Sequence, residues 1–555
     1  MANRTGGQIL VDQLKIHGAD HVFCVPGESY LAVLDALHDA PQIKTITCRH
    51  EGNAAMMAEA HGKLTNRPGI CMVTRGPGAT NASAGLHVAM QDATPMILFI
   101  GQVARDQVER EAFQEIDYRR MFGQVTKWTA QVDDASRLPE LIARAFRVAT
   151  SGRPGPVAIA LPEDMLTEMA DVSDALAYTP LESWPGADEL ETMRGMLAKA
   201  QRPMMLLGGA PWDAEAVSAI QSFAETNQLP VATSFRRADR FDNGHPLYAG
   251  DLGIGPNPEL LEAIKSSDLL IVVGARLTEM TTGGYTLFDI PVPKQALVHI
   301  HPDPEELGRV YHPALAINAT PREFAKSLAA LQPVDNPVWA GSGEATHAAY
   351  AEWQVCPPNP GDIQLGAVME WLEANMPDET IYTNGAGNFS VWLHRFHRYR
   401  RFATELAPTS GSMGYGFPAA IAAAIVEPET PVVCFAGDGD FLMSAQDLAT
   451  AMAAGAKPVT IVFNNGILGT IRMHQENHYP GRVSATDLVN PDFAAYAKAF
   501  GAHGETVSTT AEFAPAMQRA LASGKAAVIE LTLDPEAITP RTTLTKLRQA
   551  AQDKA

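Results

Sequence analysis

The sequence predicts an α/β protein built from three doubly wound domains, each with a parallel sheet covered by helices on both faces. Short apolar runs rich in β-branched residues alternate with amphipathic helical segments along most of the chain, which is the pattern of parallel strands joined by crossover helices. The chain also has 555 residues. That length is too great for one hydrophobic core and suits about three domains.

The first domain is expected to cover residues 1–172. A strand over TITCRH (45–50) accompanies four more apolar runs, which we predict as buried strands: HVFCV (21–25), GICMVT (69–74), MILFIG (96–101) and PVAIAL (156–161). The chain then becomes acidic and turn-rich between residues 171 and 190, and we interpret that segment as a linker.

The second and third domains are expected over residues 188–335 and 355–540, with a turn-rich stretch at 331–343 between them. The predicted strands of the second domain are PMMLLGG (203–209), LPVATS (229–234), DLLIVVGAR (268–276) and ALVHIHP (296–302). Those of the third domain are TIYTN (380–384), PVVCFAG (431–437), PVTIVFNN (458–465) and AAVIEL (526–531).

Composition excludes several classes of protein. Sixty-three acidic residues against 42 Lys and Arg leave a net charge of −21, which would repel nucleic acid or an anionic membrane surface. Five cysteines without a CxxC pair indicate reduced thiols in a reducing compartment. No apolar run approaches the roughly 20 residues that span a bilayer, and the N-terminus lacks a signal-peptide pattern. We therefore expect a cytoplasmic protein that acts on a small molecule, without nucleic-acid or membrane partners.

Two motifs follow neighbouring strands of the third domain. The strand at 431–437 runs into Gly437-Asp438-Gly439-Asp440, after which helical spacing resumes over residues 441–455; the next strand ends in Asn464-Asn465-Gly466. A glycine-rich strand-to-helix turn offers free N–H groups to a phosphate, and carboxyl ends of parallel strands meet at one edge of the sheet.

This edge of the sheet therefore has the groups of a magnesium diphosphate site, because Mg²⁺ prefers oxygen ligands that it shares with phosphates. The expected metal ligands are Asp438, Asn465 and a backbone carbonyl at Ile467, with Leu468 and Gly469 beside the diphosphate. Each motif alone is more often a turn. Two of them after successive strands favour the metal site.

These paired motifs resemble the cofactor signature of thiamine-diphosphate enzymes, and the rest of the chain is similar to their acetolactate synthase and 2-oxo-acid decarboxylase group. The resemblance implies a pyrimidine-binding, a central and a diphosphate-binding domain. It also implies a homodimer or homotetramer, in which each active site lies between the first domain of one subunit and the third domain of another.

The resemblance also assigns cofactor-binding residues. Glu51, in RHEGNAAMMAEAHGKLT, matches the catalytic glutamate that faces the cofactor's pyrimidine ring, although Glu is common in a first helical turn for dipole reasons alone. In APTSGSMGYGF, Met413 matches the bulky residue beneath the cofactor and Gly411 the carbonyl for its amino group. Gly387 and Asn388, in TNGAGNFSVW, are expected at the diphosphate.

Three first-domain residues are expected to face the substrate, and each has a plainer alternative. Glu28 in VPGESY can shuttle protons or be a solvated loop residue. Gln114 in EAFQEID matches an active-site glutamine of the synthases or lies on a helix surface. Arg75 in VTRGPGATN replaces a small residue of the synthases, and it either binds a carboxylate or forms a salt bridge at a subunit contact.

The chain departs from the residue patterns of both pyruvate decarboxylases and acetolactate synthases. Pyruvate decarboxylases have paired histidines where this chain has Gly101-Gln102, and a glutamate where it has Ile471; simple decarboxylation to an aldehyde is therefore disfavoured. Acetolactate synthases have a lysine where this chain has Glu163, which argues against acetolactate formation from pyruvate. His474 and His478 are alternative pocket groups, or exposed surface residues.

The central stretch VGARLTEMTTGG (273–284) resembles the FAD-binding stretch of anabolic synthases, with Arg276 available for a phosphate and Met280 in place of a second arginine. FAD, an ADP-type ligand and an empty site remain open alternatives here.

The function expected from the resemblance is a lyase or carboligase that acts on 2-oxo acids or acyloins. A 2-oxo-acid decarboxylase and a flavin-linked oxidase are the alternatives within the family. A non-catalytic regulatory paralogue is the alternative from another class, and the intact Glu51, Asp438 and Asn465 argue against it.

Overall fold

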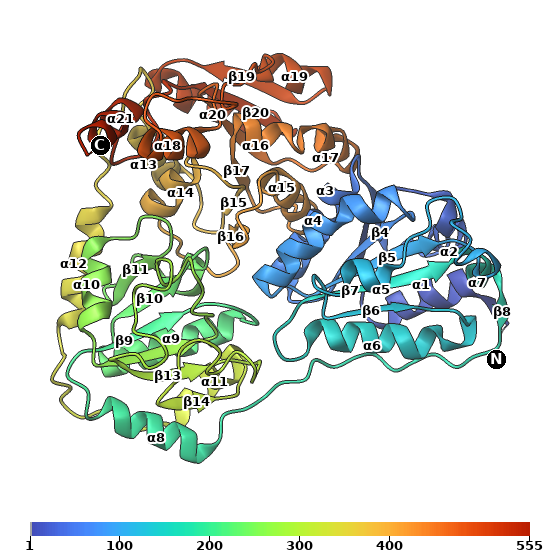
Figure 1. The fold of residues 1–555 in the computed structure, drawn as a ribbon, viewed down its shortest axis with the longest axis horizontal. Helices are drawn as coiled ribbons and strands as arrows, with labels where there is room; N and C mark the ends of the chain where they lie inside the picture. Colours follow the sequence, from blue (N-terminus) through green and yellow to red (C-terminus); the bar gives the residue numbers. More distant parts are fainter. Residues whose placement is uncertain (1–2, 555) are drawn as a thin grey trace.

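Three six-stranded parallel sheets organise the molecule, as the sequence predicts. The computed structural model describes residues 3–554. Figure 1 shows the first domain in blue and cyan, the central domain in green and yellow, and the third domain in orange and red. Residues 171–186 have no regular secondary structure and run as an extended linker to the central domain (Figure 1).

The first sheet has the strand order β3-β2-β4-β5-β7-β6. Its strands are β2 (His21–Cys24), β3 (Lys44–Thr47), β4 (Gly69–Val73), β5 (Met96–Gln102), β6 (Trp128–Gln131) and β7 (Pro156–Pro162). Its helices are α1 (Gly6–Ile16), α2 (Leu31–His38), α3 (Glu51–Thr65), α4 (Pro77–Asp92), α5 (Tyr118–Phe122), α6 (Leu138–Thr150) and α7 (Glu163–Thr167). A short antiparallel pair, β1 (Arg4–Thr5) and β8 (Met169–Ala170), closes the domain.

The central sheet has the order β11-β10-β9-β12-β13-β14. Its strands are β9 (Pro203–Leu207), β10 (Val231–Ser234), β11 (Tyr248–Leu252), β12 (Leu269–Val273), β13 (Ala296–Ile300) and β14 (Leu315–Ile317). Its helices are α8 (Ala187–Leu197), α9 (Ala214–Asn227), α10 (Pro258–Ser266), α11 (Pro321–Ser327) and α12 (Ser342–Trp353). Tyr350 of α12 packs edge-on against Tyr248 of β11, with ring centroids 4.9 Å apart, so this helix covers the central sheet.

The third sheet has the order β16-β15-β17-β18-β20-β19. Its strands are β15 (Ile381–Asn384), β16 (Glu405–Leu406), β17 (Val432–Gly437), β18 (Val459–Asn464), β19 (His503–Val507) and β20 (Ala527–Thr532). Its helices are α13 (Leu365–Asn375), α14 (Ser390–Phe396), α15 (Gly416–Val426), α16 (Asp438–Leu442), α17 (Leu448–Ala454), α18 (Gly469–His478), α19 (Phe493–Ala499), α20 (Thr510–Ala522) and α21 (Leu544–Gln552).

The apolar runs of the sequence correspond to the four inner strands of every sheet, and the TITCRH strand corresponds to β3 at an edge. Within the three six-stranded sheets, the strands that the sequence pattern does not predict are edge strands: β6, β11, β14, β16 and β19. An edge strand pairs on one side only. Several of these strands are also just partly buried, so they lack the continuous apolar run of an inner strand.

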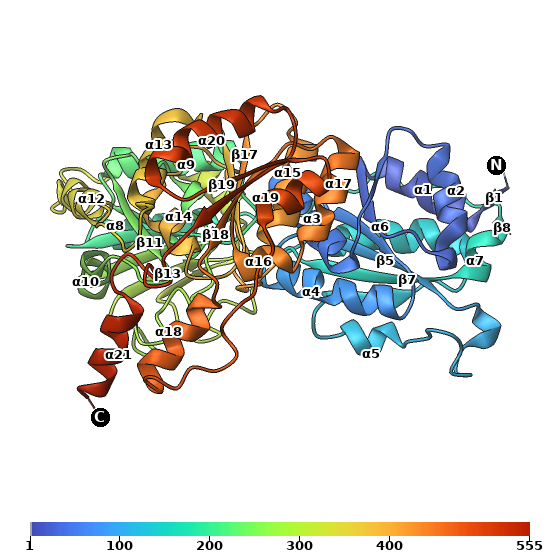
Figure 2. The ribbon, with the colours of Figure 1, turned by 90° about the horizontal axis from the view of Figure 1, so that it is seen from above.

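One apolar cluster joins the first and third domains. Helices α3 and α4 cover one face of the first sheet, and small buried side chains of α3 pack against those of α15 in the third domain. The helices α3 and α15 lie side by side in Figure 2. The close contact of alanine-rich helix faces fixes the relative position of the two domains within one chain.

All five cysteines are free thiols, in agreement with the sequence prediction. None of the helices formed by the described residues is long and apolar enough to cross a membrane.

Candidate active site

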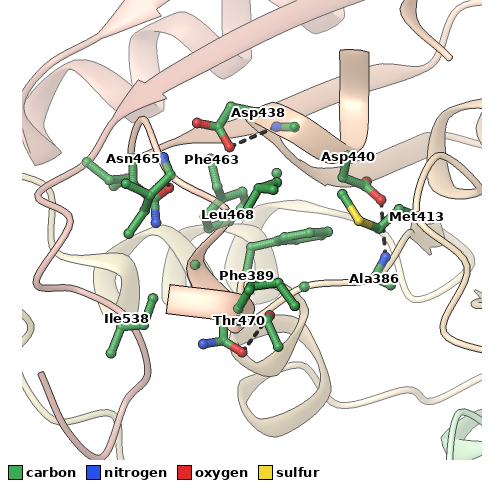
Figure 3. Close-up of a pocket in the computed structure, with 18 of the residues that line it drawn as sticks. Ala386, Phe389, Met413, Asp438, Asp440, Phe463, Asn465, Leu468, Thr470 and Ile538 are labelled. Carbon is green, nitrogen blue, oxygen red and sulfur yellow. Dashed lines mark hydrogen bonds between the residues drawn. The ribbon is translucent and has the colours of Figure 1, made fainter. Parts of the chain in front are cut away.

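A cavity of about 260 Å³ lies at the carboxyl edge of the third sheet. Its walls come from the loops after β15, β17 and β18, from the loop before α15 and from the segment before α21 (Figure 3). Every third-domain residue that the resemblance assigns to the cofactor lines this cavity: Gly387, Asn388, Gly411, Met413, Gly437, Asp438, Gly439, Asp440, Asn465, Ile467, Leu468 and Gly469.

Asp438 joins the two motifs that the sequence singled out. Its Oδ1 accepts from the backbone N–H of Gly439 at 2.8 Å, and its Oδ2 accepts from that of Gly466 at 2.9 Å. Burial raises the pKa of the Asp438 carboxyl above its usual range. All these donors are neutral, so a cation beside Asp438 would find an uncompensated carboxylate.

Asn465 is half-buried, and its Oδ1 accepts from the backbone N–H of Ile467 at 3.3 Å. In Figure 3 it lies near Asp438, on the opposite side of the cavity from Met413. Asp438, Asn465 and the Ile467 backbone thus lie together at one end of the cavity, where their oxygens can hold a hard cation.

The helix expected over residues 441–455 is interrupted. Helix α16 ends at Leu442, a 3₁₀ turn covers Ala445–Asp447, and α17 starts at Leu448. The field of such a short helix is small. An anion at this end of the cavity would therefore depend on individual N–H groups more than on a long helix dipole.

Asp440 links two loops that approach the cavity from different strands. Its Oδ1 accepts from the backbone N–H of Gly414 at 2.8 Å and from that of Ala386 at 3.2 Å. A Cβ at Gly385 would lie 2.1 Å from the same oxygen, so only glycine fits there. Burial raises the pKa of Asp440 to about 7. Asp440 thereby positions the loops of Gly387 and Met413.

Two residues that the sequence analysis did not single out complete this framework. Asn490 donates its side-chain amide to Asp438 Oδ2 at 2.8 Å. Arg236, which is 3% exposed, reaches over from the central domain and donates to the backbone carbonyls of Pro408 and Gly385. Neither residue follows a motif-bearing strand, so the sequence offered no signal for them.

Apolar side chains form the rest of the cavity wall. Phe389, Trp392 and Phe463 line one part of it, and Leu533 and Ile538 come from the segment before α21. Helix α21 lies against α18 in both ribbon views (Figures 1 and 2), which keeps this segment over the cavity.

Arg548 of α21 holds that packing. It forms a two-pronged ion pair with Glu476 of α18, whose side chain is 0% exposed.

The first-domain residues lie elsewhere in the single chain. Glu51 is the first residue of α3, is half-buried, and its Oε2 accepts from Asn81 Nδ2 at 2.9 Å. Glu28 is exposed at the start of a 3₁₀ turn. Gln114 is half-buried with φ +66°. None of these side chains lines the third-domain cavity of the same chain.

Arg75 is 9% exposed and forms a salt bridge within its own chain, with 2.8 Å between its Nη1 and Glu163 Oε2. His474 and His478 are exposed on α18 with stacked rings, 6.3 Å between centroids.

A second cavity, of about 790 Å³, lies between all three domains. Among its lining residues are Arg153, Arg236, Arg276, Met280 and His474. Arg276 is engaged by Glu306, with 3.2 Å between Nε and Oε2.

Three parallel α/β domains with a carboxylate-bearing cavity at one sheet edge have the arrangement of a ligand-binding protein of the doubly wound class. Models of the thiamine pyrophosphate enzyme family match all three domains: the N-terminal TPP binding domain over residues 4–121, the central domain over 190–328 and the C-terminal TPP binding domain over 385–531.

Similar curated proteins point the same way. The chain is 32% identical to the acetolactate synthase isozyme 2 large subunit of Escherichia coli strain K12 over 533 residues, covering 95% of each chain. It is 33% identical to the acetolactate synthase large subunit of Parasynechococcus marenigrum over 530 residues, covering 91% of this chain and 83% of the relative. The acetolactate synthase isozyme 1 large subunit of E. coli strain K12 is 32% identical over 542 residues, which cover 96% of this chain and 94% of the relative.

The chain therefore belongs to the thiamine pyrophosphate enzyme family. It is a thiamine-diphosphate-dependent, acetolactate synthase-like carboligase, as the resemblance of its motifs implies.

Proposed function

We propose that this enzyme joins or cleaves carbon–carbon bonds of 2-oxo acids or acyloins, with Mg²⁺ as the cation that holds the diphosphate. The observation that carries the proposal is the single cavity that gathers Asp438, Asn465, Met413 and Gly387 from four separate segments. When bound, thiamine diphosphate supplies a nucleophilic carbon for the substrate carbonyl and takes up the electron pair left by C–C cleavage.

The site fits Mg²⁺ by the chemistry of its donors. Asp438 and Asn465 offer oxygen atoms. The Asp438 carboxylate is buried, and the groups that donate hydrogen bonds to it are all neutral. Asp438, Asn465 and the Ile467 carbonyl would hold the ion, and Gly439, Leu468 and Gly469 would contact the diphosphate. Met413 and the Gly411 carbonyl would orient the pyrimidine end of the cofactor.

Glu51 would hold a proton at the pyrimidine ring, and Gln114 and Glu28 would contact the substrate. Because none of the three lines the cavity of its own chain, we propose that a second copy supplies them, in a homodimer or homotetramer. The relatives are named large subunits, which supports a further small-subunit partner as an additional assembly.

Subunit complementation tests this arrangement. Glu51→Gln and Asp438→Ala should each abolish turnover. Mixed dimers contain one intact site, so random reassembly of equal amounts should restore about one quarter of wild-type activity. An inactive mixture would contradict a shared site, and a Glu51→Gln enzyme as active as wild type would contradict the proposed role of Glu51.

The reaction itself is tested with purified holoenzyme and a panel of 2-oxo acids and acyloins, with products identified by mass. The names of the relatives favour an acetolactate-type product, whereas Glu163 favours a different acceptor. Aldehyde and CO₂ as sole products would support the decarboxylase alternative. A yellow protein that reduces a dye would support the flavin-linked oxidase. No turnover of any substrate would overturn the proposal.

For the second cavity we propose an anionic nucleotide, FAD or an ADP-type ligand. Arg153, Arg236, Arg237 and Arg276 line this cavity, and guanidinium groups suit a phosphate group. Arg276 is less available, because Glu306 already pairs with it. Release of the bound molecule by denaturation and its absorption spectrum would identify it; a nucleotide-free, fully active enzyme would exclude the proposal.

A further inference from the structure

Arg75 and Glu163 form an ion pair across the carboxyl edge of the first sheet. Arg75 follows β4 and Glu163 follows β7, and β5 lies between these strands. The Arg75 side chain is 11% exposed and that of Glu163 is 36% exposed, with 2.8 Å between Nη1 and Oε2. At both positions the chain departs from the acetolactate synthase pattern, and the two departures have opposite charges.

The same guanidinium also holds a loop. Arg75 Nε donates to the backbone carbonyl of Phe113 at 3.1 Å. Phe113 belongs to the segment 108–117, which has no helix or strand and connects the 3₁₀ turn Arg105–Gln107 to α5. Two of the three guanidinium nitrogens are therefore engaged by this chain itself. A free fork, which bidentate recognition of a substrate carboxylate needs, is not present.

The loop has a backbone that needs such anchors. Glu109, Glu111 and Gln114 have φ values of +64°, +55° and +66°, in the left-handed region that non-glycine residues seldom adopt. Strained segments of this kind persist only where surrounding contacts determine them. Outside the loop, those contacts come from residues at the ends of the first sheet's strands.

Neighbouring contacts converge on the same loop. Gln102, at the end of β5, donates its side-chain amide to the Ile116 carbonyl at 2.9 Å. Tyr118 accepts from the Gly76 N–H at 2.9 Å. A Cβ at Gly76 would lie 2.7 Å from the Cβ of Gln114, so Gln114 sits directly against the residue that follows Arg75.

We propose that Arg75, oriented by Glu163, is a positioning residue that sets the location of Gln114, and that it is not a receptor for a substrate carboxylate. This inference rests on the proposed function, in which Gln114 contacts the substrate. If so, loss of the ion pair should slow turnover of charged and of uncharged substrates equally.

The first test compares kcat and KM for a 2-oxo acid and for an uncharged acyloin. Arg75→Ala and Glu163→Gln should each lower kcat for both substrates by a common factor of about 10 to 100, because a displacement near 1 Å is costly to catalysis. The double variant should be no slower than Arg75→Ala, and Arg75→Lys should recover part of the rate. A rise in KM confined to the 2-oxo acid would make Arg75 a carboxylate receptor and overturn the inference.

The second test needs no turnover, so it separates this inference from the proposed function. Amide hydrogen exchange over residues 108–117 should accelerate in Arg75→Ala and Glu163→Gln. Arg137→Ala is the matched control, since it removes an exposed ion pair with Glu140 of 2.7 Å elsewhere in the same domain. Unchanged exchange over 108–117 would overturn the inference. If exchange accelerates in the variants while wild type shows no carboligase activity, Arg75 anchors the loop but the proposed function is wrong.

Discussion

The side-chain amide of Asn490 donates to Oδ2 of Asp438 at 2.8 Å and to Oδ1 of Asn464 at 2.9 Å. Asn490 thus bridges the ends of β17 and β18, where the two cofactor motifs lie. Together with the Gly466 N–H, which donates to the same Asp438 oxygen, it holds the carboxylate in one orientation. The Asp438 carboxylate, the proposed metal ligand, is thus preorganised by a residue that is not itself part of either motif.

Asn490→Ala should weaken Mg²⁺ binding by about 10- to 100-fold, the usual cost of losing a partner that orients a metal ligand. The measurement is a Mg²⁺ titration of metal-free protein at saturating thiamine diphosphate, followed through recovered activity. Asn477→Ala changes an exposed asparagine of α18 and serves as the control. Equal Mg²⁺ affinity in both variants would remove Asn490 from the metal site.

Arg236→Ala should destabilise the protein by about 2–4 kcal/mol, because two buried carbonyls lose a charged donor. Since those carbonyls belong to the Gly387 and Gly411 loops, the affinity for thiamine diphosphate should fall as well. Thermal unfolding and cofactor titration measure the two effects. Arg202→Ala is the control, because it removes only an exposed hydrogen bond to the Ser266 carbonyl and should leave cofactor affinity unchanged. Unchanged cofactor affinity in Arg236→Ala as well would show that the central domain does not support the site.

Arg548→Ala should release α21 from α18, since the buried Glu476 carboxylate loses its cationic partner. Ile538 and Leu533 would then cover the cavity less firmly, so the KM for thiamine diphosphate should rise and protease should cleave more readily near residues 533–543. Gln549→Ala, which breaks only a bond to Asp553 in the same segment, is the control. Wild-type protease resistance of Arg548→Ala would argue that apolar packing alone holds the helix.

Glu405 should make stability depend on pH. Burial, with Asp239 close by, raises the pKa of Glu405 from 4.5 to about 7. The folded state therefore binds this proton more tightly than the unfolded chain, so its stabilisation is complete below pH 4.5 and is lost as pH rises towards 7. The loss is at most about 3 kcal/mol.

Urea unfolding of wild type and Glu405→Gln across this pH range measures the effect. The glutamine can still accept from the Ala238 N–H, which bonds Glu405 at 2.7 Å, but it does not titrate. As pH rises, the free energy of unfolding of wild type should therefore fall relative to that of Glu405→Gln. Parallel pH profiles would show that folding does not shift the pKa of Glu405.

The sequence pattern predicted much of the fold because inner strands of parallel sheets are buried on both faces and must be apolar. The Asp438 and Asn465 motifs could be joined for a related reason: each follows directly after an inner strand, and the carboxyl ends of parallel strands share an edge. Edge strands such as β6 and β19 carry no comparable apolar run, and residues of the site outside the motifs carried no local signal.

What the sequence alone determined is the class of cofactor chemistry and the shared location of the two motifs, since connectivity along β17 and β18 is enough to bring Asp438 and Asn465 to one edge. Only the tertiary structure decided which distant side chains contact Asp438 and the loop of residues 108–117. Asn490 lies 52 residues from Asp438, Glu163 lies 88 from Arg75, and Arg236 lies 149 from Gly385. Contacts over such separations depend on how whole domains pack, and no local pattern of residues encodes them.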